Sequence, residues 1–374
     1  MSPESKDDFA SFRIKGEVIR SPSPNQSGMT EGSPSRLNAV LVIPFCFSLR
    51  NSSLSIFCIP NSNKNHNVKF NRQSYTLLEV LNRFCLIRGC RVKFKPLHNS
   101  FVAEVEGENL FCGSIGSEID LLLKALDEYA VLVIRHQPLA DKQQLEFASS
   151  LGGSLHEKTG VAALGPNRFG NEALTDISNI DEAGKILSKT DRRRQYGLAN
   201  RLWHTDASFQ SPKGRYSMLS VKKLPESGCE TQFCNLYAAY AELNHQLQDE
   251  IELLSAHHSI AHSRESLGFS FSRDEKSQLK GADHPLVFVN PTTGRKSLYI
   301  AAHASHILGQ SVPDSRVFLS ELIEHSTQLK FVYRHVWQPD DFVIWDNRST
   351  MHRGMRFEED TEKREMRRVT TLDD

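Results

Sequence analysis

The chain is poor in cysteine, and the cysteines it has do not stand at metal-ligand spacing. Its 374 residues include seven cysteines, and no two of them are separated by two residues. The sequence therefore excludes a disulfide-rich scaffold, a zinc ribbon and a thioredoxin-like redox motif. An odd number of thiols in a chain of this size is typical of a reduced intracellular protein, so we expect a cytoplasmic location.

Net charge and long apolar runs are also absent. Lys and Arg together number 45, as do Asp and Glu, so a broadly basic nucleic-acid-binding surface is not expected. The longest apolar run, Ala39 to Phe47, contains Pro44 and is too short to cross a bilayer. It also begins too far from Met1 for an ordinary signal peptide. We expect no nucleic-acid or membrane partner, and the sequence leaves open whether the chain forms a homo-oligomer.

The first hundred residues differ in composition from the rest. Residues 1–37 are rich in Ser, Pro and Asn and carry too little apolar surface to fold, which predicts disorder. Residues 38–105 hold apolar patches without helical or strand periodicity and are interpreted as an irregular extension. Translated non-coding sequence, such as an intron, would produce the same lack of periodicity over residues 38–74. The folded domain is expected to occupy residues 106–374, so a chain that begins near residue 100 should keep it.

From about residue 110 the chain has regular periodicity. Ser117 and Asp120 form a capping-box pattern ahead of a helix, and AVLVIRH at 130–136 is typical of a buried strand. A second helix is expected from Asp141 to the glycine pair at 152–153.

Short strand-like runs dominate beyond Arg201. They are RYSMLSV, PLVFV, KSLYIAA and DFVIW, with helices expected only near 236–256 and 314–328. Strands that outnumber the helices argue against a doubly wound parallel sheet. They favour a double-sheet barrel with helices on the outside.

Three residues of the types that bind metal stand out: His204 and Asp206 in LWHTDASF, and His352 in WDNRSTMHRG. On a strand, an H-x-D pair points both side chains to one face. A third ligand from a distant strand would complete two histidines and one carboxylate on one face of an octahedron, the set that suits non-haem Fe(II). Zinc would favour more histidine or cysteine in a tetrahedral shell.

Two other histidine groups have the appearance of ligand sets. No carboxylate stands at a matching spacing beside either group, so we interpret both as structural. They are His257, His258 and His262 in the first group, and His303 and His306 in the second.

A basic cluster, KREMRR, follows the last predicted ligand. A dicarboxylate held by iron at one end needs a cation at its other end, and arginine binds carboxylates bidentately. On a strand, Arg364 and Arg368 face one way and Arg367 the other, so two arginines could line one cavity. A solvated charged strand is the alternative interpretation.

Nine stretches resemble, in order, the TauD/TfdA family of Fe(II)- and 2-oxoglutarate-dependent dioxygenases. Within that family they are most similar to the 2,4-dichlorophenoxyacetate (aryloxyalkanoate) branch. The stretches are DEYAVLVIRHQPL, TDISN, ANRLWHTDASF, RYSMLSV, GCETQF, GRKSLYIAAHASH, FVYRHVW, WDNRSTMHRG and REMRRVTTLDD. The resemblance implies a mainly β fold, a double-stranded β-helix or jelly roll with flanking helices. It also implies an enzyme that uses Fe(II), 2-oxoglutarate and O₂ and releases succinate and CO₂.

The resemblance also assigns roles to single residues. It makes the H-x-D pair and His352 the catalytic iron ligands. Thr231 and Arg368 fall where the far carboxylate of 2-oxoglutarate is held, and Arg364 falls near the cosubstrate or substrate. One extra residue separates His352 from the basic cluster, so Arg367 is the alternative to Arg368.

The resemblance implies a small-molecule substrate that is an organic anion. Lys158 and Lys185 stand where aryloxyacetate members carry basic residues, although lone lysines can equally be solvated charges. Ala207 replaces a hydroxyl residue and Asn290 stands in place of a histidine, so the substrate need not be an aryloxyacetate. A sulfonate, an amino-acid derivative or a secondary metabolite is the alternative. A non-catalytic barrel protein is the alternative of another class, and the intact ligand set argues against it.

Overall fold

The computed structural model describes residues 92–98, 101–107, 116–157 and 168–374, together with three short strands earlier in the chain. These are β1 (Phe45–Arg50), β2 (Ser53–Cys58) and β3 (Ser74–Tyr75), which form a three-stranded sheet of their own. The disorder predicted for residues 1–37 lies outside the described residues.

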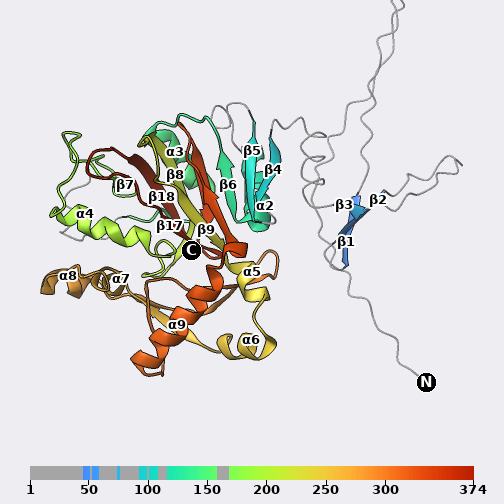
Figure 1. Cartoon of the computed structure of the whole chain (residues 1–374). Helices are drawn as coiled ribbons and strands as arrows, with labels where there is room; N and C mark the ends of the chain where they lie inside the picture. The colour runs from blue at the N-terminus through green and yellow to red at the C-terminus, as the bar shows by residue number, and fades with distance from the viewer. Residues whose placement is uncertain are drawn as a thin grey trace, which may run out of the picture. The chain divides into compact units, whose positions relative to one another are not determined.

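A seven-stranded sheet is the largest element of the structure (Figure 1). Its neighbouring strands are antiparallel except for β5 and β6, which are parallel. In spatial order the strands are β4 (Lys93–His98), β5 (Val102–Glu106), β6 (Val131–Ile134), β16 (Phe342–Asp346), β8 (Gly214–Lys223), β18 (Glu365–Leu372) and β7 (Thr175–Ser178).

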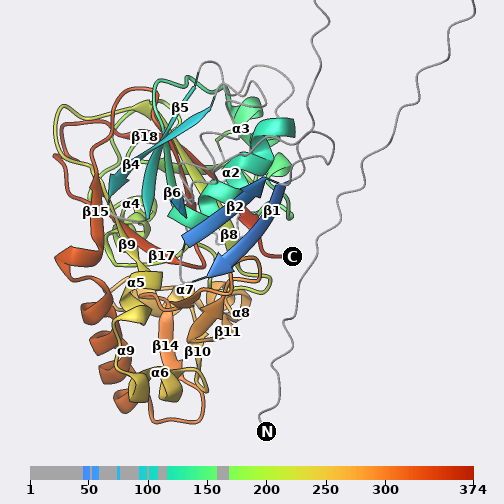
Figure 2. The same ribbon diagram turned by 90° about the vertical axis from the view of Figure 1, so that its right-hand side faces the viewer.

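Helices α2 (Gly116–Tyr129) and α3 (Asp141–Ser150) cover one face of this sheet (Figure 2). Leu126 and Phe147 of these helices share one core with Leu132 of β6. Every residue of β6 is buried, because the strand has a packed layer on both faces.

A second sheet packs on the opposite face. Its strands are β15 (Val332–His335), β9 (Thr231–Asn235) and β17 (Thr350–Gly354), in that order. Phe233 of β9 and Trp345 of β16 meet in the core between the two sheets. The described residues therefore form a mainly β structure with flanking helices.

A smaller sheet and several helices pack at one end of these two sheets (Figures 1 and 2). The sheet has the order β11 (Ala282–Pro285), β10 (Ser255–His258), β14 (Ala304–Ile307), and a hairpin joins β12 (Val287–Val289) to β13 (Lys296–Leu298). The helices are α4 (Arg192–Gly197), α5 (Leu236–Ala241), α6 (His245–Ile251), α7 (Ile260–Glu265), α8 (Arg273–Gln278) and α9 (Val312–Ser326). No helix in the described ranges has the length and apolar content needed to span a bilayer.

Most predicted elements are present, with shifted ends. The strands predicted from AVLVIRH, RYSMLSV, PLVFV, KSLYIAA and DFVIW are confirmed as β6, β8, β12, β13 and β16. Helix α2 begins at Gly116, so Ser117 lies in its first turn and not at its cap. The helical stretch predicted at 236–256 is two helices, because Asn244 caps α6 through its side chain and breaks the stretch.

Two strands that precede the predicted domain boundary at residue 106 belong to the main sheet. Strands β4 and β5 pair with each other, and β5 also pairs with β6, so both belong to the main sheet. Val92 and Phe94 are buried in the core beneath α2. The folded domain therefore includes residues from at least Val92, and a chain that begins near residue 100 would lose an edge strand of the sheet.

A buried imidazole lies inside the smaller sheet. His258 of β10 has no exposed surface, and its ring stacks on Tyr299 at 5.6 Å and meets the edge of His284 at 5.5 Å. Within the part of the chain that the structure describes, neither ring nitrogen of His258 has a hydrogen-bond partner. Burial, followed by the neighbouring His284 and His257, lowers the pKa of His258 to about 3.

Candidate active site

The three predicted metal ligands meet in the structure. His204 and His352 form an isolated antiparallel bridge, in which each backbone N–H donates to the carbonyl of the other, at 3.0 and 2.8 Å. Nε2 of His204 lies 3.9 Å from Oδ1 of Asp206, and Nε2 of His352 lies 3.8 Å from its Oδ2. One ligand atom from each residue lies within 4.8 Å of the others, and no other such group occurs among the described residues.

The protonation of this group suits a divalent cation. Nδ1 of His204 lies 2.8 Å from the carbonyl oxygen of Leu202, an arrangement in which Nδ1–H donates and Nε2 keeps its lone pair for a metal. Burial lowers the pKa of His204 to about 4 and that of His352 well below its usual value, so both rings are neutral. Burial would raise the pKa of Asp206, but Arg368 and the two histidines outweigh it and lower that pKa. Two neutral imidazoles and one carboxylate fit Fe(II) and leave coordination positions free.

A buried amide orients the Asp206 carboxylate. Oδ1 of Asn347 accepts the backbone N–H of Asp206 and the indole N–H of Trp345, each at 3.0 Å, and its Nδ2 donates to Ser217 at 2.9 Å. The Ser217 hydroxyl donates to Oδ2 of Asp206 at 2.8 Å. The sequence analysis missed Asn347 and Ser217, although Asn347 stands in the WDNRSTMHRG stretch. Trp345 packs against the His352 ring at 4.7 Å, beneath the site.

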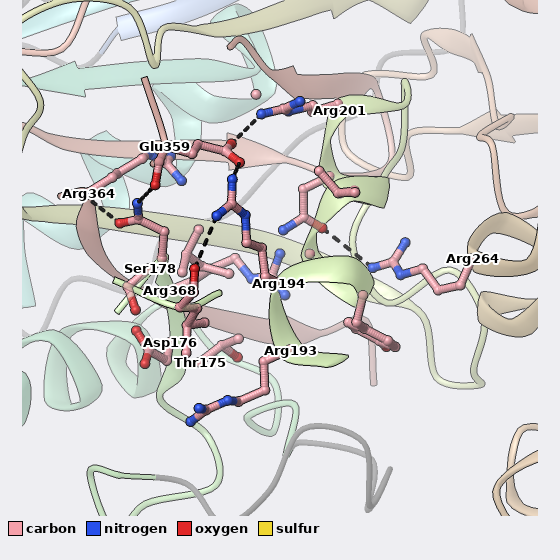
Figure 3. A pocket seen from close by; sticks show the side chains of 18 of the residues that line it. Thr175, Asp176, Ser178, Arg193, Arg194, Arg201, Arg264, Glu359, Arg364 and Arg368 are labelled. Carbon is pink, nitrogen blue, oxygen red and sulfur yellow. Dashed lines mark hydrogen bonds and ion pairs between the residues drawn. The ribbon is translucent and has the colours of Figure 1, made fainter. Parts of the chain in front are cut away.

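A cavity of about 250 Å³ opens beside His204 and Asp206, and many of its walls are cationic (Figure 3). Such a charge distribution favours anionic ligands. The arginines that line it are Arg168, Arg193, Arg194, Arg201, Arg264, Arg364 and Arg368.

The three arginines of the basic cluster separate as strand alternation requires. Arg364 and Arg368 line the cavity, and Arg367 does not. Nη1 of Arg368 donates a short hydrogen bond to Oδ1 of Asp206, so this guanidinium lies at the metal site itself. Arg367 pairs with Glu365 at 2.7 Å on the other face of β18 and stacks over the ring of Phe169 at 3.7 Å.

Arg364 lines the cavity, whereas Thr231 is buried and is not among the lining residues. Thr231 of β9 is opposite Gly354 of β17, and its Oγ1 accepts the indole N–H of Trp337 at 3.0 Å. Arg364 contacts the thiol of Cys229, two residues before Thr231. The Nε of Arg364 is shielded from solvent and has no hydrogen-bond partner among the described residues.

Neither lysine predicted to bind substrate is found among the residues that line the cavity. Lys158 lies outside the described residues. Lys185 is exposed and is not among the residues that line the cavity. Ala207 is buried with φ of 53° and Asn290 holds a turn by accepting the backbone N–H of Thr292 at 2.8 Å, and neither lines the cavity.

Several lining residues carried no signal in the sequence analysis. His303, interpreted as structural, lines the cavity with its ring 6.0 Å from that of His204. His156 also lines it, and burial, followed by Arg368, lowers its pKa to about 4. Tyr196 and Arg264 complete this side of the cavity. They come from separate helices, so no local spacing in the sequence could have grouped them.

The chain matches one protein family and several characterised proteins. The model of the "Taurine catabolism dioxygenase TauD, TfdA family" matches residues 93–370, and so begins at β4. The α-ketoglutarate-dependent 2,4-dichlorophenoxyacetate dioxygenase of Cupriavidus pinatubonensis is 43% identical over 280 residues, which are 75% of this chain and 97% of that protein. An alkylsulfatase of Acinetobacter baylyi is 30% identical over 290 residues, 75% of this chain and 84% of that protein. The crystal structure of AAD-2 in complex with Mn(II) and N-oxalylglycine superposes with a TM-score of 0.72 at 38% identity, and covers 75% of this chain and 97% of that one.

Proposed function

The chain belongs to the TauD/TfdA family of dioxygenases, and from this premise we propose that it hydroxylates a small organic anion in the cavity beside His204, Asp206 and His352. It is an oxidoreductase that uses Fe(II), 2-oxoglutarate and O₂. The observation that carries the proposed site is the buried group of two neutral imidazoles and one carboxylate at the end of an arginine-lined cavity.

Iron bound there supplies the oxygen chemistry, which converts 2-oxoglutarate to succinate and CO₂ as the substrate is hydroxylated. The protein holds the ligands in place. His204 offers an unprotonated Nε2 and His352 a neutral ring, and Ser217 and Asn347 fix the plane of the Asp206 carboxylate. Such outer hydrogen bonds set how well a metal site is formed.

The far carboxylate of 2-oxoglutarate fits best between Thr231 and Arg364. Gly354, opposite Thr231, lies two residues beyond His352 on β17, which is roughly 6.6 Å along a strand. The four C–C bonds of 2-oxoglutarate, each about 1.5 Å, span roughly 5 Å when extended. Because Thr231 accepts a bond from Trp337, its own hydroxyl hydrogen is available to a carboxylate.

This assignment reverses the order that the sequence favoured for the two arginines. The family resemblance implied Arg368 for the far carboxylate, but its bond to Asp206 supports a position at the metal end of the cavity. Arg364 has no ion-pair partner among the described residues, and it contacts the thiol of Cys229, two residues before Thr231. We therefore assign Arg364 to the far carboxylate and Arg368 to the metal end.

The finer features of the fold and the cell compartment are part of the same proposal. Two sheets that face each other across the core around Phe233 and Trp345 support a double-stranded β-helix, or jelly roll. Buried free thiols at Cys229 and Cys234 are consistent with a reducing cytoplasm.

An aryloxyalkanoate is the substrate class we favour. The 43% identical relative is named for 2,4-dichlorophenoxyacetate, and an arginine-lined cavity suits a carboxylate. Hydroxylation of the carbon beside the ether oxygen gives a hemiacetal, which collapses and so cleaves the ether. A sulfate ester or sulfonate is the second candidate, because the alkylsulfatase relative is named for one and the same cations suit it.

The proposed function is tested by succinate release with Fe(II), 2-oxoglutarate and 2,4-dichlorophenoxyacetate. His352→Ala should abolish release. His306→Ala, a histidine away from the cavity, should serve as the matched control and retain it. Succinate release that persists in His352→Ala would remove the metal site from the reaction.

The assignment of the arginines has its own test. Arg364→Gln should raise the KM for 2-oxoglutarate about 10- to 150-fold, because a hydrogen bond to a charged group contributes roughly 1.5–3 kcal/mol. Arg368→Gln should raise this KM less. A larger rise in KM for Arg368→Gln than for Arg364→Gln would restore the order that the sequence favoured.

A further inference from the structure

One buried asparagine holds the segment that leads into strand β18. Asn179 directly follows β7 and is 7% exposed. Its backbone N–H donates to the carbonyl of Arg364 at 3.2 Å, which extends the pairing of β7 with β18 by one residue. Arg364 itself lies just outside β18, which begins at Glu365. The backbone of Arg364 is therefore held at the open end of the strand by Asn179.

The side chain of Asn179 is bonded to the same segment through both of its N–H groups and its oxygen. Its Nδ2 donates to the backbone carbonyls of Glu359 and Glu362, at 3.0 and 2.8 Å. Its Oδ1 accepts the backbone N–H of Arg364 at 2.8 Å. A planar amide offers two donors and an acceptor, and here they match two carbonyls and one N–H of a turn. Residues 355–364, all of which the structure describes, form no helix or strand, so these bonds fix a stretch that no regular element supports.

The segment that Asn179 holds carries charges of the cavity wall. Arg364 lines the cavity and has no ion-pair partner among the described residues. Glu359 forms an ion pair with Arg201 and lies 3.7 Å from Arg194, and both of these arginines also line the cavity (Figure 3). A shift of this segment would therefore move one unpaired cation and the carboxylate that neutralises others.

The guanidinium of Arg364 depends on its backbone for its position. Its side chain contacts the thiol of Cys229, which is a weak hydrogen-bonding group, and its Nε has no partner within the described ranges. Ordering a long side chain on binding costs free energy, and a backbone that is already fixed reduces this cost. Misplacing a binding group by about 1 Å can reduce function by roughly 100-fold. The anchor of the Arg364 backbone should thus affect how well its guanidinium binds an anion.

We propose that Asn179 is a positioning residue for the cosubstrate: it fixes the backbone of Arg364 so that the guanidinium meets the far carboxylate of 2-oxoglutarate. The proposal rests on the proposed function, in which Arg364 binds that carboxylate. Asn179 acts through Arg364, because its amide is already bonded to three backbone groups of the protein.

Binding of N-oxalylglycine to the Mn(II)-loaded chain tests this without turnover, since N-oxalylglycine keeps both carboxylates of 2-oxoglutarate. In titration calorimetry, Asn179→Ala should weaken N-oxalylglycine binding about 10-fold, the lower end of the loss expected when Arg364 is replaced. It should leave the affinity for Mn(II) unchanged. Asn290→Ala is the matched control, because Asn290 is also a buried asparagine that holds a turn, away from the cavity. It should keep the affinity for N-oxalylglycine.

A double-mutant cycle separates positioning from a general loosening of the fold. A general loosening would weaken N-oxalylglycine binding to the same extent whether or not Arg364 is present. Positioning through Arg364 requires that Asn179→Ala change the affinity little in the Arg364→Gln background. If Asn179→Ala does not fold, Asn179→Ser, whose hydroxyl can still donate to one carbonyl, should show the same dependence on Arg364.

Three results would overturn the assignment. They are an unchanged affinity for N-oxalylglycine in Asn179→Ala, an equal loss in the Arg364→Gln background, and a matching loss of Mn(II) affinity. A chain that binds no N-oxalylglycine refutes the proposed function and this inference with it. A chain that binds N-oxalylglycine through Arg364 but does not respond to Asn179→Ala refutes the inference alone.

Discussion

Replacing His258 with leucine should make the protein less sensitive to acid. His258 is fully buried between Tyr299 and His284, and neither of its ring nitrogens is hydrogen-bonded to any of the described residues. The folded protein holds this ring neutral, with a pKa of about 3, whereas the unfolded chain protonates it near the ordinary value of 6.5. Stability from this residue is therefore present above pH 6.5 and is lost as the pH falls toward 3.

The size of the effect follows from the two pKa values. At pH 7 the unfolded chain gains only about 0.2 kcal/mol from protonating His258, and at pH 5 it gains about 2 kcal/mol. His258→Leu removes this contribution without breaking a hydrogen bond and keeps an apolar side chain in the core. On going from pH 7 to pH 5, the free energy of unfolding should therefore fall by about 2 kcal/mol less in the variant than in the unaltered chain.

The measurement is denaturant unfolding of the metal-free protein at both pH values, because bound metal would add its own pH dependence. Tyr299→Phe is a suitable control, since it alters the same cluster without removing a group that titrates in this range; burial raises the pKa of Tyr299. It should keep the full acid sensitivity. An equal loss of stability in His258→Leu and the unaltered chain would refute the reasoning.

Three further predictions concern the edge of the fold and the site. A chain that begins at residue 100 lacks Val92 and Phe94, which lie in the core. Its free energy of unfolding should therefore be lower than that of a chain that begins at residue 91, by at least about 3 kcal/mol. Equal midpoints in denaturant unfolding would contradict this. Asn347→Ala removes the hydrogen bonds that hold the backbone of Asp206 and, through Ser217, its carboxylate. It should weaken Mn(II) binding about 10- to 100-fold in titration calorimetry. Unchanged affinity would mean that these hydrogen bonds are dispensable. Arg367→Gln should leave the KM for 2-oxoglutarate unchanged in the succinate assay, and a raised KM would place this side chain in the cavity.

The metal ligands could be predicted from the sequence because the signal was local. The text around the ligands matched a known family. The H-x-D pair was predicted on a strand, but His204 lies in an isolated bridge and Asp206 in a turn. Strand alternation did separate Arg367 from Arg364 and Arg368. It could not say how far along the strand each arginine lies from the metal, because the bond between Arg368 and Asp206 depends on how distant strands pack.

Other features depended on contacts that no spacing encodes. In β4 only Phe94 of the six residues is buried, so KFKPLH carries little apolar alternation and was interpreted as irregular. Arg264 and Tyr196 come from different helices, and their ring contact exists only in the folded chain. Residues whose partners are distant in sequence are thus where the reasoning from sequence alone failed.

The backbone bridge between His204 and His352 has a consequence for how the enzyme gains and loses its metal. The two imidazoles are brought together by main-chain hydrogen bonds, so chain folding, and not the ion, meets the entropy cost of bringing these distant segments together. When the ion leaves, the two segments that carry His204 and His352 stay paired through these main-chain hydrogen bonds. Metal exchange should then proceed without unfolding, and one divalent ion can replace another in a preformed metal-binding site.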